Sequence, residues 1–143
     1  MLVDIQNIIM TTLEAIKDIG GKRVFTTVDV WNDDPEEMIK KVIRLPAALV
    51  ALGDGRFGER ESIGRGKFQV RLGWDVFILF ENVRNPADAS AQGLSYIDAV
   101  VAEITDTMVD NFSLVPAGFA LVATKNGKSL YGVNFELDER MGK

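Results

Sequence analysis

The sequence of 143 residues predicts one α+β domain over residues 1–143, in which a mixed or antiparallel sheet of about five strands packs against two main helices. Apolar residues at helical spacing occur near the start of the chain and between residues 94 and 108. Apolar residues occupy every second position over residues 68–80, which is typical of a strand. Near the end, Asn126 and Gly127 separate two further strand-like runs. The predicted order is α-β-α-β-β-α-β-β.

The first helix is predicted from an apolar stripe that follows helical spacing. We expect Asp4 to be its N-cap and the pair Gly20-Gly21 to end it. A strand rich in β-branched and aromatic residues follows over residues 24–31. The residues of the stripe are Ile5, Ile8, Ile9, Leu13, Ile16 and Ile19.

A short second helix is predicted to begin after Asp34. Asp34 is a suitable N-cap, Pro35 fits the first helical position, and acidic residues occupy the first turn. Pro46 prevents this helix from continuing. The next run, residues 47–52, is apolar throughout, so we expect a strand that is buried on both faces.

The second half of the chain contains the longest predicted strand. Toward its end, Phe77 and Leu79 make its second face apolar as well. We expect another part of the same fold to cover this half. The alternative is that Phe77 and Leu79 form a contact between subunits.

A second main helix and a hairpin complete the predicted fold. The helix follows a turn at residues 85–88 and carries one apolar stripe. The hairpin has strands over residues 119–125 and 128–137, and Asn126-Gly127 is the usual type I′ pair for its tip. The residues of the helical stripe are Leu94, Ile97, Val100, Val101, Ile104 and Met108.

Composition excludes several classes of function. The chain has no Cys and no His, which removes thiolate nucleophiles, disulfides, the usual general base and the commonest metal ligands. Its net charge of −5 disfavours nucleic-acid binding, which usually needs a basic excess. The N-terminus lacks the basic region of a signal peptide, and acidic residues interrupt every apolar run, so we expect a soluble intracellular protein.

The glycines at 53, 55 and 58 form a G-x-G-x-x-G sequence directly after the apolar run. In a nucleotide site, the last glycine opens a helix whose amides hold the phosphates. Here Gly58 is followed by the polar segment 59–66, which contains two more glycines and no apolar helical face. We therefore expect no cofactor, and we interpret residues 54–65 as a long, flexible loop with charges of both signs that forms an interaction surface.

Other candidate sites have simpler explanations. Three carboxylates in the glycine segment could act in acid/base chemistry, but three arginines lie among them in what we expect to be a solvated loop. The acidic cluster at residues 33–37 does not fit a calcium-binding loop and is explained by helix capping. We therefore predict no catalytic residue, no metal site and no enzyme activity. The three carboxylates are Asp54, Glu59 and Glu61, and the three arginines are Arg56, Arg60 and Arg65.

The residues also support a resemblance to a known family. A Pro-Ala pair, an apolar run and a Gly-Arg-Phe-Gly segment follow one another over residues 45–58. A long strand that contains residues 74–80 comes next, and then a helix opened by a glycine-aromatic segment at residues 93–96. Over most of the chain this resembles the Mu-like phage family of small tail proteins. By fold pattern, that family is similar to the tail terminators of long-tailed phages.

The resemblance implies a structural role in the virion. Tail terminators form a hexameric ring at the head-proximal end of the tail tube, so the implied partners are further copies of the chain, the tail tube protein and the neck or head-completion protein, with the sheath protein as an additional partner. The protein would be assembled in the cytoplasm of the bacterial host and would end up in the virion tail. A negative net charge suits a ring through which DNA passes without specific binding.

Our hypothesis is that residues 54–65 contact a tube or neck subunit, with Arg56 and Phe57 as anchors, because Arg and aromatic residues are common hot spots. Three alternatives stay open: a neck or head-completion protein, a tail tube subunit, and a carboxylate-dependent enzyme or small-ligand-binding module. A buried, uncompensated carboxylate pair would indicate the last of these. The candidate contact residues are Asp54, Arg56, Phe57, Glu59, Arg60, Arg65, Phe77 and Leu79.

Overall fold

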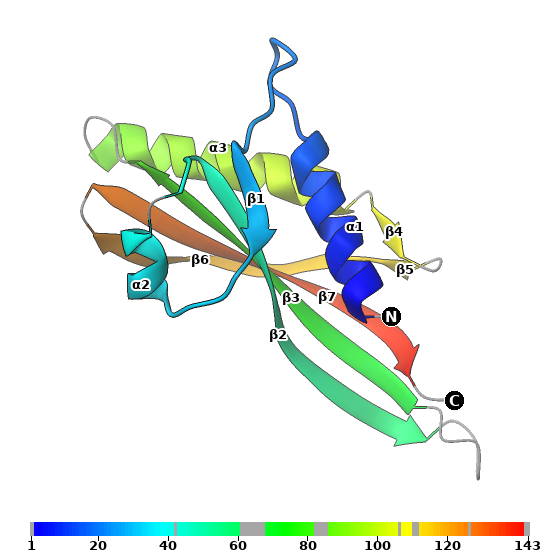
Figure 1. The fold of residues 1–143 in the computed structure, drawn as a ribbon. Coiled ribbons are helices and arrows are strands. Elements are labelled where there is room, and N and C mark those ends of the chain that lie inside the picture. Colours follow the sequence, from blue (N-terminus) through cyan, green and yellow to red (C-terminus); the bar gives the residue numbers. More distant parts are fainter. Residues whose placement is uncertain are drawn as a thin grey trace.

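The computed structural model describes residues 2–41, 43–60, 68–81, 86–105, 107–109, 112–125 and 127–141. The elements are α1 (Leu2–Ala15), β1 (Thr27–Val30), α2 (Pro35–Lys40), β2 (Ala47–Arg60), β3 (Phe68–Glu81), α3 (Pro86–Thr105), β4 (Met108–Val109), β5 (Phe112–Ser113), β6 (Val115–Lys125) and β7 (Lys128–Met141). Five strands form a mixed sheet in the order β1-β2-β3-β7-β6, and β4 pairs with β5 in a small separate sheet (Figure 1). The predicted α+β class and order of main elements are therefore confirmed.

The main core lies between one face of the sheet and the helices α1 and α3. Alternate residues of β3 point into it, from Val70 to Phe80, and both helices contribute their apolar stripes. This is the face predicted from the period-two pattern of β3. The helical residues that are buried in this core include Ile5, Ile9, Leu13, Ile97, Val100 and Ile104.

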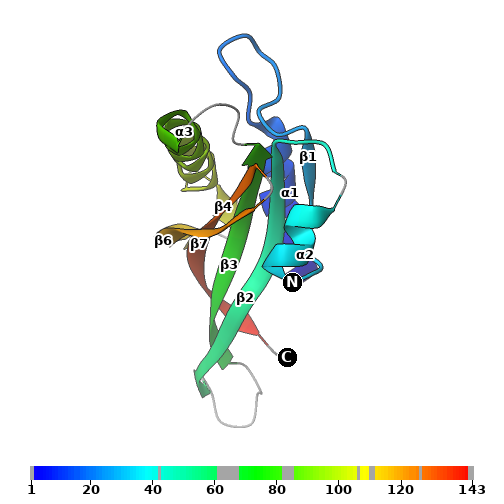
Figure 2. The same cartoon turned by 90° about the vertical axis from the view of Figure 1, so that its left-hand side faces the viewer.

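The opposite face of the sheet has a smaller apolar cluster under α2. Ile39 of α2 packs there against Ala47, Leu79 and Leu130, and Trp31 stacks on Phe77 with ring centroids 4.1 Å apart. Figure 2 shows α2 and α3 on opposite sides of the sheet. The prediction that the second face of β3 is covered by the same fold is therefore confirmed for Leu79.

The largest difference from the sequence-based expectation concerns the glycine segment. Residues 54–60 are part of strand β2 and pair with β3, with register shifts after Leu52 and after Phe57. The expected flexible loop is thus wrong for this part, because pairing with β3 outweighs the low strand preference of its glycines. Residues 61–65 of the expected loop lie outside the described residues.

The first helix is shorter than expected. It ends at Ala15 rather than at the glycine pair, and Asp4 lies within its first turn instead of capping it. The carboxylate of Asp18 accepts a hydrogen bond from the Lys22 amide at 3.0 Å, and Gly21 adopts a φ of 79°. This local turn replaces the last helical turn, and Ile19 is consequently exposed instead of buried.

Other predicted boundaries differ by a few residues. Strand β1 is limited to four residues, because it pairs with β2 only along Ala47 to Val50. Met108 lies in β4 instead of the helical stripe, and Leu94 of that stripe is exposed. Gly127 has a φ of 72°, as expected at a hairpin tip, whereas Asn126 lies outside the described residues.

The helix α3 approaches the sheet most closely at Gly93. A Cβ atom at this position would lie 2.6 Å from Cε2 of Tyr131 and 3.0 Å from Cζ of Phe80. The glycine-aromatic segment at residues 93–96 is therefore inside α3 and does not open it, contrary to the expectation. Its glycine allows the helix to rest on two aromatic rings of the sheet.

We predict that Gly93→Ala lowers the free energy of unfolding by about 1–2 kcal/mol. Overpacking costs about 1–3 kcal/mol, and the better helix propensity of alanine recovers part of it. Gly118→Ala is the matched control, because no atom lies within 4 Å of the added Cβ. Chemical denaturation of both variants measures the effect, and equal stability of the two would contradict this account of the packing.

Candidate functional site

The strands β2, β3 and β7 continue past the helices as a three-stranded arm, formed by residues 54–60, 68–73 and 137–141. Figures 1 and 2 both show this arm extending beyond the N-terminal end of α1. Phe57 lies on it and is 68% exposed. Nε of Arg56 lies 3.7 Å from the carboxylate of Asp54, two residues before it on the same face. The structure thus brings Asp54 and Arg56 together on one face of the arm, whereas Phe57 lies on the opposite face, because it pairs with Val70 of the core.

The face of the arm turned away from α1 and α3 is polar. Nε of Arg71 donates a hydrogen bond to Asp138 at 3.0 Å, and the Asn134 amide donates one to Asp75 at 2.8 Å. The hydrogen bond from Arg71 to Asp138 raises the pKa of Arg71, and the charges of Asp138 and Glu136 add to this effect. The guanidinium therefore stays charged, and the face carries paired charges in solvent.

Two glycines of this face make room for two carboxylates. A Cβ atom at Gly73 would lie 2.2 Å from Oδ1 of Asp54, and one at Gly53 would lie 2.5 Å from Oδ2 of Asp75. The first glycine of the G-x-G-x-x-G sequence therefore leaves space for a side chain on the sheet, that of Asp75. Because Gly58 continues the strand instead of opening a helix, the phosphate-binding geometry is absent from the described part of this segment.

The remaining predicted contact residues are distributed differently. Glu59 and Arg60 end strand β2, and Arg65 lies outside the described residues. Leu79 is 0% exposed beneath α2, so it offers no surface to a second protein. Phe77 is partly covered by its stack with Trp31. Of the two possibilities for Phe77 and Leu79, cover by the same fold or contact with another subunit, the structure shows cover by the same fold.

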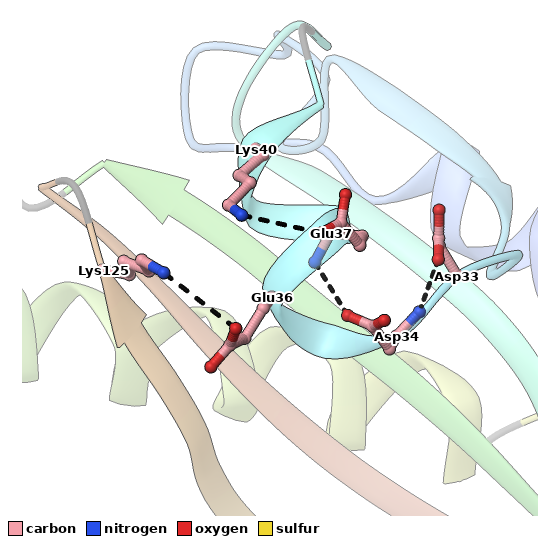
Figure 3. Close-up of polar contacts among 6 residues, drawn as sticks. All are labelled: Asp33, Asp34, Glu36, Glu37, Lys40 and Lys125. Atoms are coloured by element: carbon pink, nitrogen blue, oxygen red, sulfur yellow. Dashed lines mark hydrogen bonds and ion pairs between the residues drawn. The ribbon is translucent and has the colours of Figure 1, made fainter.

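The acidic cluster before and within α2 acts in capping and in ion pairs (Figure 3). The carboxylate of Asp34 accepts a hydrogen bond from the Glu37 amide at 2.9 Å, which confirms the predicted N-cap. Glu37 pairs with Lys40 at 3.5 Å, and Glu36 lies 4.0 Å from Lys125 at the end of β6. Within the described part of the chain, no group of three or more acidic side chains could hold a metal ion.

Every aspartate and glutamate whose side chain is described is at least partly exposed. Asp75 is the least exposed of those near the arm, and it is hydrogen-bonded to Asn134. A buried, uncompensated carboxylate pair was the feature that would have indicated a carboxylate-dependent enzyme. The described carboxylates do not provide it.

The sequence reasoning missed the most apolar exposed surface, which lies on β6. Phe119 is 60% exposed and Leu121 is 53% exposed, and Val115 and Val122 of the same strand are also exposed. Between β6 and α3 lies an open groove of about 340 Å³, lined mainly by apolar residues and by Asp98 at its rim. The sequence shows only that ten residues in a row, 115–124, carry no charge, which does not distinguish an exposed edge strand from a buried one.

Comparison with known proteins leaves the family of this chain open. No known protein family matches it, and no curated protein is significantly similar to it. None of the described helices is both long enough and apolar enough to span a membrane.

We predict that Leu79→Ala lowers the free energy of unfolding by about 2–4 kcal/mol, because it leaves a cavity in the cluster under α2. Leu121→Ala, at an exposed position, serves as the matched control and should change stability by less than about 0.5 kcal/mol. Urea denaturation distinguishes the two. A Leu79 variant as stable as the control would place this side chain at a surface instead.

Proposed function

We propose that this chain is a structural protein of a long-tailed phage virion, a tail terminator whose copies form a ring that caps the tail tube and joins it to the neck. The observation that carries the proposal is the three-stranded arm. It extends beyond the helices and presents Phe57, Arg56 and Asp54 to solvent. Exposed aromatic and arginine side chains are typical anchors for protein contacts.

Further features support an assembly role over a chemical one. The chain lacks Cys and His, and its described carboxylates are solvated or paired. Among the described strands, none pairs with the outer side of β1 or of β6, and open sheet edges are surfaces on which other chains assemble. The resemblance of residues 45–58 and 74–80 to small tail proteins of Mu-like phages favours a role in the virion over other assembly roles.

A neck or head-completion protein and a tail tube subunit would share these properties. A terminator would be present as one ring in each particle, whereas a tube subunit would occur in many copies. The phenotype of a null mutant separates the three roles, because each is needed at a different stage of assembly.

We predict that a stop codon in the gene, within its phage or prophage, gives over-long or irregular tails that lie apart from full heads after induction. Without a terminator, nothing ends the growth of the tube. Negative-stain electron microscopy of the particles makes the measurement. Tails of normal length that are not joined to heads would indicate a neck protein instead, and normal joined particles would exclude a tail role.

We predict that Arg56→Ala combined with Phe57→Ala leaves the protein folded but reduces the yield of joined particles when it complements the stop codon. Both side chains are exposed, so their removal should change stability little. Lys17→Ala with Ile19→Ala, in the exposed turn after α1, is a control of similar chemistry. Normal assembly by a folded Arg56/Phe57 variant would remove these residues as anchors.

A further inference from the structure

Strand β6 is an edge strand with unusually little protection. Its residues 115–124 carry no charge, and each residue from 115 to 122 is exposed. Edge strands normally carry charges or are covered, because their free N–H and C=O groups pair readily with other chains. Within β6, Pro116 near its beginning limits pairing, because proline has no N–H to donate to another strand. An uncharged edge of this length is a surface for strand pairing.

The opposite side of the sheet has a second open edge. Strand β1 pairs with β2 only along residues 47–50, so residues 51–60 of β2 have β3 as their one strand partner in the described structure. Residues 52–58 are all exposed. The charges of this edge compensate each other, since Asp54 pairs with Arg56.

Two exposed apolar side chains from each edge lie on the same face of the sheet. Residues that pair directly across strands share a face, and the partners of these side chains belong to the core under α1 and α3 or pack against it. The pairs are Leu52 with Trp74, Phe57 with Val70, Phe119 with Val133, and Leu121 with Tyr131.

We propose that copies of this chain join head to tail, with β6 of one copy pairing with residues 51–60 of β2 in the next. The choice of a second copy as the partner rests on the ring of the proposed function and on charge. Each copy carries a net charge of −5, so two copies repel each other except where uncharged or self-compensated surfaces meet. These two edges are such surfaces, and their contact places Phe119 and Leu121 beside Leu52 and Phe57 of the neighbour.

The strand directions suit this contact. Strand β2 is antiparallel to β3, β3 to β7, and β7 to β6. When the sheet continues in the same orientation into a second copy, β6 therefore runs antiparallel to the neighbouring β2. The pairing fills the edge of β2 just beyond the point where β1 ends.

The positions of the edges along the strands suit a closed ring. Val115 of β6 pairs with Glu136, Glu136 pairs with Gly73, and Gly73 pairs with Asp54, so Val115 and Asp54 lie at the same height in the sheet. From this height, β6 runs toward the beginning of β2. The middle of β6 is thus offset from the middle of residues 51–60 by about six residues, roughly 20 Å. The next β2 would lie four strand spacings away, roughly 19 Å. This offset corresponds to a strand tilt of about 45°, at the upper end of the roughly 35–45° of closed barrels.

The test uses one blocking substitution on each edge of the purified full chain. Leu121→Glu blocks β6, Phe57→Glu blocks β2, and Ile19→Glu adds the same charge in the exposed turn after α1, away from both edges. Circular dichroism checks folding, and light scattering and native mass spectrometry give the number of 15.8 kDa subunits. Phe119→Glu and Leu52→Glu replace either edge variant that does not fold.

We expect the wild type and Ile19→Glu to form complexes of more than two subunits. Each edge variant alone should be monomeric, with association weakened by roughly tenfold or more. An equal mixture of the two edge variants should form a complex of two subunits and stop there. This follows because each variant supplies one intact edge of the opposite kind, so one contact forms between them and none beyond it.

Three results would overturn the inference. A wild type that stays monomeric shows that these edges do not pair between copies. Normal assembly of Phe57→Glu together with loss of assembly in Leu121→Glu indicates symmetric β6–β6 pairing. A mixture that gives no two-subunit complex excludes the head-to-tail contact. The proposed function is decided separately by the tails of the stop-codon mutant, so either idea can fail while the other stands.

Discussion

The structure depends on the pairing of β3 with strands on both of its sides. All fourteen of its residues pair with β7, and it pairs with β2 from Phe68 to Leu79. One face of β3 supplies the centre of the core under α1 and α3, and the last part of its other face supplies the cluster under α2. The two main helices and α2 are buried against the sheet that is built around this strand, α1 and α3 in the cluster on one face and α2 in the cluster on the other.

The same strand is longer than the helices that cover it, and the exposed surfaces of the protein follow from this difference. Where helices lie on both faces, the sheet is apolar on both faces. In the arm, the uncovered face changes to paired charges such as Arg71 with Asp138. The two edges of the sheet, in contrast, stay without a strand partner. Strand β1 is too short to cover β2, and nothing in the described structure pairs with the outer side of β6. The surfaces that we propose for subunit contact thus lie at the edges of the sheet, while most of the area of its faces is used for folding.

Sequence patterns predicted those parts of the fold that depend on neighbouring residues. The alternation in β3, the N-cap at Asp34 and the positive φ of Gly127 are local signals, and the structure contains all three. The extension of β2 through Gly55 and Gly58 was missed, because its stability comes from pairing with β3 and not from its own residues. The candidate site was predicted in part. Asp54, Arg56 and Phe57 are all exposed, with Phe57 on the face opposite the other two, but the exposure of β6 could not be predicted, because it requires knowing which strand lies at the edge.

The glycines of β2 connect the fold to the assembly that we propose. Glycine weakens a strand because it supplies no side chain for packing and loses more backbone entropy on folding. Over residues 51–60 this weak strand is held from one side only, by β3. A partner on its outer edge would pair with the backbone of this segment and bury more of the Phe57 side chain, which would stabilise the segment. The G-x-G-x-x-G sequence, which looks like a nucleotide-binding motif, therefore fits a strand in two ways. Glycines on this face leave space for the carboxylates of Asp54 and Asp75. Glycines in a strand also allow another backbone to approach closely, as the proposed contact needs.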